Sequence, residues 1–265
     1  MDDLTKKDLL IAQYQTPTNL EARIELHRRF STAVQRWPEW VFNQLDLPPS
    51  VHILELGCGP GGLWAENLDR LPASWSVVLV DLSPGMIDQA QANLLPRCEQ
   101  FTFAVADAGA IPFADNRFDA VIANHMLYHV ADLKETLSEI RRVLKSSGAL
   151  YAATNGSAHM RELDDLTPDF IDHMPAGSAV LSFTLQNGAA QLRPYFPTVE
   201  MRPFDDGLLV TEAAPLVNYQ LSMTGSETKI TAEQKKAFED HIGQIFFQQD
   251  GVIKITKETG LFIAA

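Results

Sequence analysis

Cysteine is scarce in this chain. The 265 residues include only two, Cys58 and Cys98, and they are far apart in the sequence. A zinc site or a disulfide framework needs several cysteines at short, regular spacings. We therefore expect two reduced thiols and no metal site.

Positive charge is also scarce. The chain has 21 Lys and Arg residues against 34 Asp and Glu residues, for a net charge of −13. A protein that binds nucleic acid needs basic surface to displace the counterions of the phosphates. The composition therefore argues against a nucleic-acid or polyphosphate partner and favours a small-molecule substrate.

Long apolar runs are missing as well. No stretch reaches the ~18 apolar residues of a membrane-spanning helix. The N-terminus opens with Asp2 and Asp3 and has no apolar leader. These absences predict a cytoplasmic protein with no membrane partner. The length suffices for one large α/β domain with insertions, or for a domain plus a cap.

The chain does contain a glycine-rich stretch that follows an apolar run. Residues 51–56 have the composition of a buried parallel strand, and Gly57, Gly59 and Gly61 come directly after it. Glycines permit positive φ and leave no Cβ between the backbone and a ligand. A helix from about Gly61 through Leu68 would point its N-terminal amides at the same spot. The stretch therefore predicts a binding site for a nucleotide-containing ligand.

The residue that discriminates between nucleotides is Glu55. The spacing Gly57-x-Gly59-x-x-Gly62 also fits the dinucleotide fingerprint of NAD enzymes. An ionised Glu55 would repel a pyrophosphate over this loop but would favour an amino group or a sulfonium. The pattern of Glu55, Gly57, Gly59 and Gly61 resembles the first motif of class I S-adenosylmethionine (SAM)-dependent methyltransferases.

Two more carboxylates follow the next expected strands. Residues 75–81 end in Asp81, which is placed to accept hydrogen bonds from both ribose hydroxyls, whether the ligand is SAM or NAD. Residues 101–106 are followed by Asp107 and the Ala108 amide, a suitable acceptor and donor for adenine. Met86 is expected either to border the adenine or to be a core methionine.

The resemblance covers residues 51–154 and includes the stretches 106–113 and 118–123, which look like those of the ubiquinone/menaquinone methyltransferase group. It implies SAM as cofactor and an N-terminal segment that folds over its methionine end. Arg23 in this segment is expected to bind the α-carboxylate of SAM through its guanidinium group. The alternative is that Arg23 is a solvated helix residue and Tyr14 a packing residue. The expected cofactor-binding residues are Tyr14, Arg23, Glu55, Gly57, Cys58, Gly59, Gly61, Asp81, Leu82, Met86, Asp107, Ala108 and Asn124.

The loop after the fourth expected strand supplies candidate catalytic residues. Ligands bind outside the carboxyl ends of parallel strands, so residues 124–130 should line the transfer site. His125 and His129 are candidates for general base, because imidazole titrates near neutral pH; either is otherwise structural. The loop departs from the Asn/Asp-Pro-Pro-Tyr/Phe stretch of enzymes that methylate nucleobases or glutamine, which argues against those acceptors.

The alternation of strands and helices up to residue 154 predicts an α/β, Rossmann-like, doubly wound sheet. The resemblance implies seven strands, of which the last, expected within residues 252–264, is antiparallel. We expect an N-terminal helical cap at 1–50, a SAM-binding core at 51–154, and substrate-cover helices with the C-terminal strands at 155–265. Helical insertions are expected after the fifth and sixth strands, the later ones at residues 212–223 and 231–248.

The sequence thus predicts a SAM-dependent methyltransferase that acts on a small molecule and needs no metal. One alternative is a protein of the same fold that binds SAM without methyl transfer, as a cyclase or a binding module. A second is an NAD-dependent oxidoreductase, against which Glu55 and Asp107 argue. Whether the acceptor atom is O, N or C, and the oligomeric state, stay open.

Overall fold

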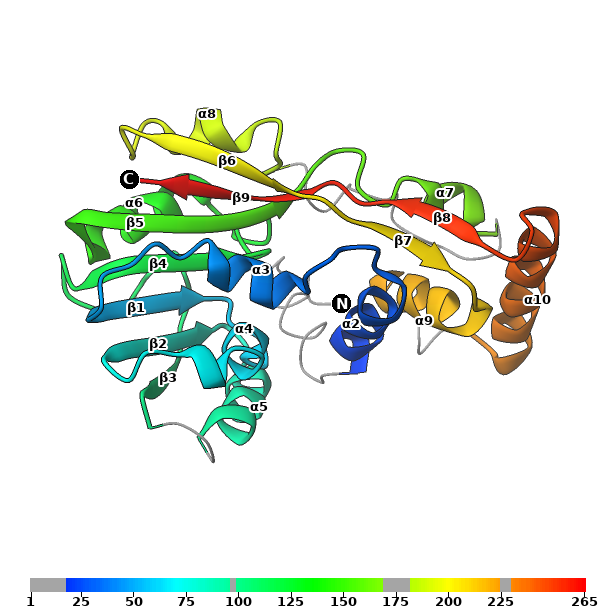
Figure 1. The fold of residues 1–265 in the computed structure, drawn as a ribbon, viewed down its shortest axis with the longest axis horizontal. Coiled ribbons are helices and arrows are strands. Elements are labelled where there is room, and N and C mark those ends of the chain that lie inside the picture. The colour runs from blue at the N-terminus through cyan, green and yellow to red at the C-terminus, as the bar shows by residue number, and fades with distance from the viewer. Residues whose placement is uncertain (1–17, 96–98, 169–181, 225–229) are drawn as a thin grey trace, which may run out of the picture.

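A seven-stranded sheet forms the centre of the computed structural model, which describes residues 18–95, 99–168, 182–224 and 230–265. The strand order is β3-β2-β1-β4-β5-β9-β6 (Figure 1). Neighbours among the first five strands of this order pair in parallel, and β9 is antiparallel to both β5 and β6. The predicted Rossmann-like sheet with an antiparallel last strand is confirmed. Its strands are β1 (Val51–Leu56), β2 (Trp75–Asp81), β3 (Phe101–Val105), β4 (Phe118–Asn124), β5 (Leu144–Asn155), β6 (Val199–Phe204) and β9 (Thr259–Ala264).

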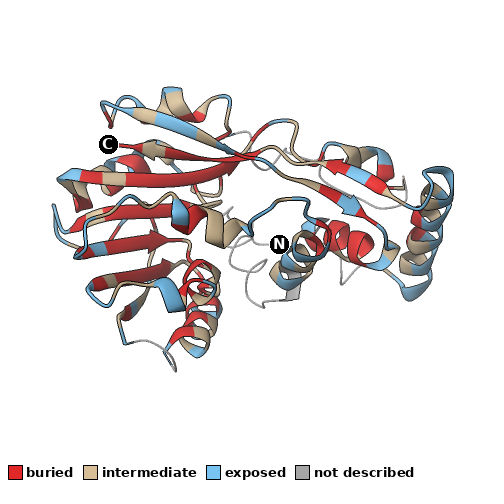
Figure 2. Ribbon diagram, in the orientation of Figure 1, coloured by how far each residue is buried: buried red, intermediate tan, exposed pale blue. Residues whose placement is uncertain are grey.

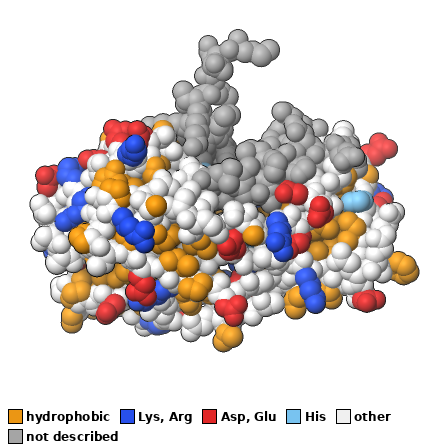
Figure 3. Space-filling view, turned by 90° about the horizontal axis from the view of Figure 1, so that it is seen from above, with side chains coloured by type: hydrophobic (Ala, Val, Ile, Leu, Met, Phe, Trp, Pro, Cys, Tyr) orange, Lys and Arg blue, Asp and Glu red, His pale blue; other side chains and the backbone are white. Residues whose placement is uncertain are grey.

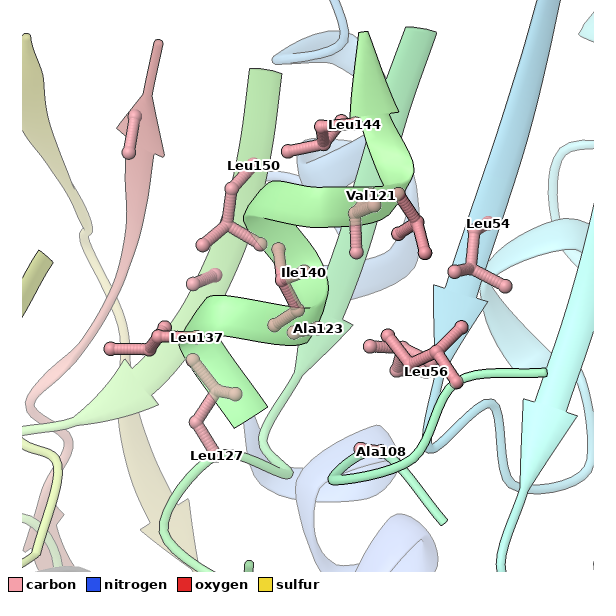
Figure 4. Packing of buried hydrophobic residues seen from close by; sticks show 14 of the residues in the cluster. Leu54, Leu56, Ala108, Val121, Ala123, Leu127, Leu137, Ile140, Leu144 and Leu150 are labelled. Carbon is pink, nitrogen blue, oxygen red and sulfur yellow. The ribbon is translucent and has the colours of Figure 1, made fainter. Parts of the chain in front are cut away.

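Both faces of this sheet are covered, which explains why its central strands are apolar along most of their length. Leu54 and Leu56 belong to the core on one face and Ile53 to the core on the other. Figure 2 shows the central strands as mostly buried, and Figure 4 shows Leu54 and Leu56 on the same side as Leu137 and Ile140 of a covering helix. One face carries α6 (Leu133–Val143) and α8 (Gly188–Leu192); the other carries α3 (Trp37–Asn43), α4 (Gly62–Ala65) and α5 (Pro84–Leu94).

A smaller unit, here called the helical lobe, lies beyond one end of the sheet and has its own apolar core. The lobe consists of α2 (Thr18–Phe30), β7 (Gly207–Val210), β8 (Ile253–Thr256), α7 (Glu162–Leu166), α9 (Ala213–Thr224) and α10 (Ala232–Gln248). In Figure 1, β6 runs on into β7, and β8 runs on into β9, so these strands connect the sheet to the lobe. The links from α2 to α3 and from β5 to α7 also pass between the two.

Of the helices in the described ranges, none is both long and apolar enough to cross a membrane.

The C-terminal segment differs from the prediction of one interrupted strand. It forms two strands in two sheets: β8 pairs with β7, and β9 lies between β5 and β6. The break at Glu258 has a local cause, because its carboxylate accepts hydrogen bonds from the Ala158 N–H (2.8 Å) and from Gln186 (2.7 Å). Strand β7 was not predicted, since four residues carry little alternation.

The two helices predicted late in the chain are present as α9 and α10. The second begins with a capping box, in which Thr231 and Gln234 satisfy each other's backbone N–H groups. The prediction of three domains at 1–50, 51–154 and 155–265 stays a prediction. Within its first segment, α2 belongs to the core of the helical lobe, whereas α3 packs on the main sheet.

The helix after the glycine loop is shorter than predicted. It was expected to run through Leu68, but α4 ends at Ala65, and a 3₁₀ turn, η1 (Leu68–Arg70), follows. The buried Asn67 side chain explains the stop, because its amide donates to the Leu63 carbonyl (2.7 Å) and to the Pro38 carbonyl (3.1 Å). The Asn67 amide thus satisfies the Leu63 carbonyl, which would accept a backbone N–H if the helix continued.

Charged side chains on the outer surface are mixed in sign. On the face shown in Figure 3, the described Lys and Arg residues are scattered among Asp and Glu residues and do not gather in one patch.

The turn into α4 depends on Gly61. Its φ is +75°, and a Cβ built there would lie 2.7 Å from Leu94 Cδ1. We predict that Gly61→Ala lowers the free energy of unfolding by ~1–3 kcal/mol, because the side chain adds left-handed strain and a clash. Urea unfolding followed by circular dichroism measures this change.

Gly62→Ala is the matched control. The neighbouring glycine has an ordinary φ, and a Cβ there would meet nothing within 4 Å. Its stability should be unchanged or raised by up to ~1 kcal/mol. Equal loss in both variants would contradict the assigned role of Gly61.

Candidate functional site

The carboxyl ends of β1, β2 and β4 lie next to one another. Leu56 at the end of β1 is in register with Val80 on one side and Ala123 on the other. The groups that follow these strands, which are the glycine loop, Asp81 and Asn124, therefore share one edge of the sheet. In open α/β sheets this edge is where ligands bind.

Asp81 holds the glycine loop in place. Its Oδ2 accepts the Gly59 N–H at 2.9 Å, and its Oδ1 accepts the Ser83 N–H at 2.9 Å. Burial raises the pKa of Asp81, and these N–H donors oppose that rise. Each carboxylate oxygen keeps a further lone pair. The side chain is thus fixed by main-chain donors and can still accept from a ligand.

The loop presents bare backbone to its surroundings. At Gly59, with φ +53°, an added Cβ would have only one atom within 4 Å among the described residues, Leu20 Cδ2 at 3.8 Å. The start of α2 therefore reaches over the loop. Gly57 lies against Met126, whose Cβ would be 2.7 Å from an added Cβ. Cys58 is buried, and burial raises the pKa of its thiol, so this side chain is a packed neutral group.

Glu55 is buried directly beneath the loop and is 2% exposed. Its carboxyl group accepts a 2.6 Å hydrogen bond from the Trp64 indole and is also hydrogen-bonded by Asn124. Burial nevertheless raises the pKa of Glu55 to about 8. Glu55 is therefore mostly protonated at neutral pH in this structure.

Asn124 has an unused acceptor beside Glu55. Its Oδ1 is buried and has no hydrogen-bond partner among the described residues. A buried acceptor without a donor is costly. A cationic N–H donor bound here would satisfy Oδ1 and would also favour the ionised form of Glu55. This pair fits the amino group of an amino-acid ligand.

The groups expected at the adenine lie at the same edge. The Ala106 N–H donates to the Asp81 carbonyl at 3.1 Å, which ties the Asp107 loop to the end of β2. Asp107 accepts the N–H of Gly109 at 2.9 Å, and Ala108 is buried. Met86 is 2% exposed on α5, and Leu82 is half-buried. Their roles toward a ligand stay predictions.

His125 has an unusual backbone and an unusual pKa. Its φ is +53°, uncommon for a residue with a Cβ, and its N–H donates to the Ala153 carbonyl at 3.1 Å. Its ring packs on Trp37 with centroids 5.1 Å apart. Burial first, and then the charges of Lys257 and His129, lower the pKa of His125 to about 3. The imidazole is therefore neutral at physiological pH and is a weak base.

His129 lies one turn further along. Its N–H donates to the Met126 carbonyl at 2.9 Å, and its ring contacts that of Tyr128 with centroids 4.5 Å apart. A role in proton transfer stays a prediction for both histidines. The value near 3 makes His125 the weaker candidate.

Arg23 lies on α2 and bonds within the helical lobe. Its guanidinium donates to Ser222 Oγ at 3.1 Å and to the Ser222 carbonyl at 2.7 Å. These bonds tie α2 to α9. The predicted grip on a cofactor carboxylate stays a prediction for Arg23. Tyr14 and Cys98 lie outside the described residues.

The sequence reasoning missed several site residues. Trp64 was assigned only to the helix after the loop, although a buried indole N–H needs a partner and Glu55 was the nearby acceptor. Trp37, which contacts His125, was not among the expected site residues. His27, His159 and Lys257 come from distant parts of the chain, and no local pattern linked them to His125. Within the described residues, no three His, Cys, Asp or Glu side chains are placed to hold a metal ion.

Comparison with known proteins places these features in a family context. Residues 54–152 match a family described as a methyltransferase domain. Demethylmenaquinone methyltransferase of Symbiobacterium thermophilum is 33% identical over 116 residues, which are 43% of this chain and 46% of that protein. The chain thus spans about half the length of the curated relatives it matches.

Solved structures show the same fold over nearly the whole chain. Phosphoethanolamine N-methyltransferase 2 of Haemonchus contortus, solved with S-adenosyl-L-methionine, has a TM-score of 0.63 and 18% identity, covering 100% of this chain and 60% of its own. The [4+2]-cyclase SpnF has a TM-score of 0.60 and 16% identity, covering 98% and 96%. The family match and the shared fold confirm the resemblance to class I SAM-dependent methyltransferases that residues 51–154 indicated.

The raised pKa of Glu55 predicts a pH effect on stability. Between its ordinary pKa of 4.5 and about 8, the folded state binds more protons than the unfolded state. The free energy of unfolding should therefore fall as pH rises through this window, by ~3 kcal/mol at pH 7 from this group. Glu55→Gln has no proton to lose and should show a smaller fall, measured by urea unfolding between pH 5 and 8.

Glu21→Gln, at an exposed position on α2, is the control. This variant should follow the pH dependence of the unsubstituted protein. A Glu55→Gln profile parallel to that of Glu21→Gln would show that Glu55 is ionised in the folded protein at neutral pH.

Proposed function

We propose that this chain, whose residues 54–152 match a methyltransferase domain, transfers a methyl group from SAM to a small-molecule acceptor. The observation that carries the proposal is the shared edge of β1, β2 and β4. Bare backbone at Gly59, the fixed carboxylate of Asp81 and the open acceptor of Asn124 converge there.

The residues at this edge suit the parts of SAM. Asp81 would accept from the ribose hydroxyls, and Asp107 with the Ala108 amide would pair with the adenine. Asn124 Oδ1 and the Glu55 carboxyl would receive the methionine amino group. SAM when bound supplies a methyl group already activated on a sulfonium.

The protein's contribution is then mainly positioning. Holding an acceptor in line with an activated group lowers the activation barrier by ~7–11 kcal/mol in favourable cases. The close approach of α2 to the glycine loop at Leu20 would help to exclude water from the methionine end. His125, neutral and fixed against Trp37, would hydrogen-bond the acceptor, and His129 is the stronger candidate for proton uptake where the acceptor needs it.

A second candidate function is SAM binding without methyl transfer. It is favoured by the shared fold with a cyclase along almost the full chain and by the low basicity of His125. An NAD-dependent oxidoreductase is disfavoured, because residues 54–152 match a methyltransferase domain.

Thermal unfolding with added ligands tests the cofactor. S-adenosylhomocysteine and SAM should raise the melting temperature, since a ligand that binds only the folded state stabilises it. NAD and NADP should not. Transfer of radiolabelled methyl from SAM into a small-molecule extract then separates an enzyme from a binding module. Stabilisation by NAD instead of S-adenosylhomocysteine would contradict the proposal.

Asp81→Ala should weaken S-adenosylhomocysteine binding by at least ~100-fold. Two charge-assisted hydrogen bonds of ~1.5–3 kcal/mol each would be lost. Isothermal titration calorimetry measures the dissociation constant. Asp81→Asn removes the charge but keeps an acceptor for the Gly59 N–H. Comparing it with Asp81→Ala therefore separates the effect of losing the charge from the effect of losing the loop contact.

Asp88→Ala, an exposed position on α5, is the matched control and should bind normally. An unchanged dissociation constant in Asp81→Ala would remove Asp81 from the cofactor site.

A further inference from the structure

A second group of polar residues comes from the elements that join the main sheet to the helical lobe, whose ribbons Figure 1 shows. It consists of His27 on α2, His125 after β4, His159 between β5 and α7, and Lys257 between β8 and β9. They are close enough for the charge of Lys257 to lower the pKa of all three histidines, in addition to the effect of burial. We call them the histidine–lysine cluster.

The protonation of His159 follows from its hydrogen bonds. Its Nδ1 accepts the Glu258 N–H at 3.2 Å, and the Thr259 hydroxyl lies 3.3 Å from Nδ1 but has Asn155 Oδ1 as partner at 2.9 Å. Burial lowers the pKa of His159 to about 3, so the ring is neutral. A neutral ring that accepts at Nδ1 carries its proton on Nε2. His159 therefore offers an N–H donor.

His27 adds a second unsatisfied group. Its Nδ1 is buried and has no hydrogen-bond partner among the described residues. Its ring meets Tyr219 edge-on with centroids 5.7 Å apart. Burial lowers the pKa of His27 well below its ordinary value, so this ring is also neutral.

The charge of the cluster comes from Lys257. Its ammonium pairs with Asp206, and both side chains are buried. Asp206 also accepts from the Ser31 hydroxyl and from the backbone N–H groups of residues 32, 33 and 207. Its negative charge is thus shared among several donors. The Glu258 carboxylate bonds away from the cluster, to Ala158 and Gln186.

Aromatic rings border the cluster. Trp37 contacts His125 and Phe204, each with centroids 5.1 Å apart, and Trp40 contacts Phe204 at the same separation. Lys257 Nζ lies 5.9 Å from the centre of the Phe204 ring. A planar apolar body would find stacking partners beside a cation and neutral N–H donors.

We propose that the histidine–lysine cluster binds the methyl acceptor, and that this acceptor is an acid with a planar apolar body whose ionised oxygen faces Lys257 and His159. The inference rests on the proposed methyltransferase function and specifies the class of its substrate. A cationic amine is disfavoured, because the site offers N–H donors from Lys257 and His159, and a protonated amine has no lone pair to accept them.

The chemistry of an ionised acceptor matches the weak basicity of His125. The oxygen lone pair forms the new O–C bond while the S–C bond of the sulfonium breaks, and that bonding pair passes to sulfur. The products are a neutral methyl ester or ether and S-adenosylhomocysteine. No proton has to be removed, so histidines that stay neutral are sufficient for positioning.

Three probes with the same ring test the charge preference: benzoate, benzyl alcohol and benzylamine. Each is titrated into the full chain saturated with S-adenosylhomocysteine, and binding is followed by NMR of the histidine Cε1–H signals, assigned with His125→Gln and His159→Gln. Benzoate should bind at least ~10-fold more tightly than benzylamine, with benzyl alcohol between them. Equal or tighter binding of benzylamine, or binding of none of the probes, would overturn the proposal.

Variants locate the effect. Lys257→Met should weaken benzoate binding at least ~10-fold, and Lys257→Arg, which keeps the charge, should retain it. Lys254→Met, an exposed lysine on β8, is the matched control and should bind benzoate normally. Equal benzoate affinity in the Lys257→Met and Lys254→Met variants would overturn the assignment to the cluster. Circular dichroism of Lys257→Met reports on any loss of folding, since this variant leaves the buried Asp206 without its ion-pair partner.

Calorimetry with S-adenosylhomocysteine on the same samples separates the two proposals. Absence of S-adenosylhomocysteine binding would overturn the methyltransferase function itself. Normal binding without a preference for benzoate would overturn only the class of acceptor.

Discussion

The hydrogen bond from the Gly59 N–H to Asp81 joins the two halves of the candidate cofactor site. The glycine loop follows β1 and Asp81 ends β2, so this bond fixes the loop relative to the neighbouring strand. The same carboxylate accepts from Ser83 at the start of α5. A small movement of Asp81 would therefore shift the loop and the entry into α5 together. The arrangement makes one side chain both a structural support and a ligand-binding group.

A second constraint is the buried polar group beneath the loop. Glu55, Trp64 and Asn124 form a network in which one acceptor, Asn124 Oδ1, is left open. A partly satisfied buried network costs stability. Proteins keep such costs mainly where a ligand can relieve them. The position of this network at the carboxyl edge of the sheet is consistent with that explanation.

The connection between sheet and helical lobe is built from charged residues that are individually paired. Lys257 pairs with Asp206, and Glu258 bonds to Ala158 and Gln186. Gly156 leaves room for the Glu258 side chain at this crossing, since an added Cβ would lie 2.0 Å from Glu258 Cδ and would displace it. Three neutral histidines lie near this Lys257–Asp206 ion pair. The acceptor site would then distinguish ligands by charge as well as by shape.

The sequence by itself determined the Rossmann-like core. Unbroken apolar strands, the glycine loop after β1 and the carboxylate at the end of β2 are local patterns, and each depends on neighbouring residues. The family resemblance supplied the antiparallel last strand. Tertiary structure decided what depends on residues far apart in the chain. It split the C-terminal segment between two sheets, paired Glu55 with Trp64, tied Arg23 to Ser222, and brought His27, His159 and Lys257 to His125. Side-chain burial and long-range pairing determine these contacts and the pKa values of the groups involved. The hydrophobic periodicity of the sequence reports only on local structure and therefore predicts neither.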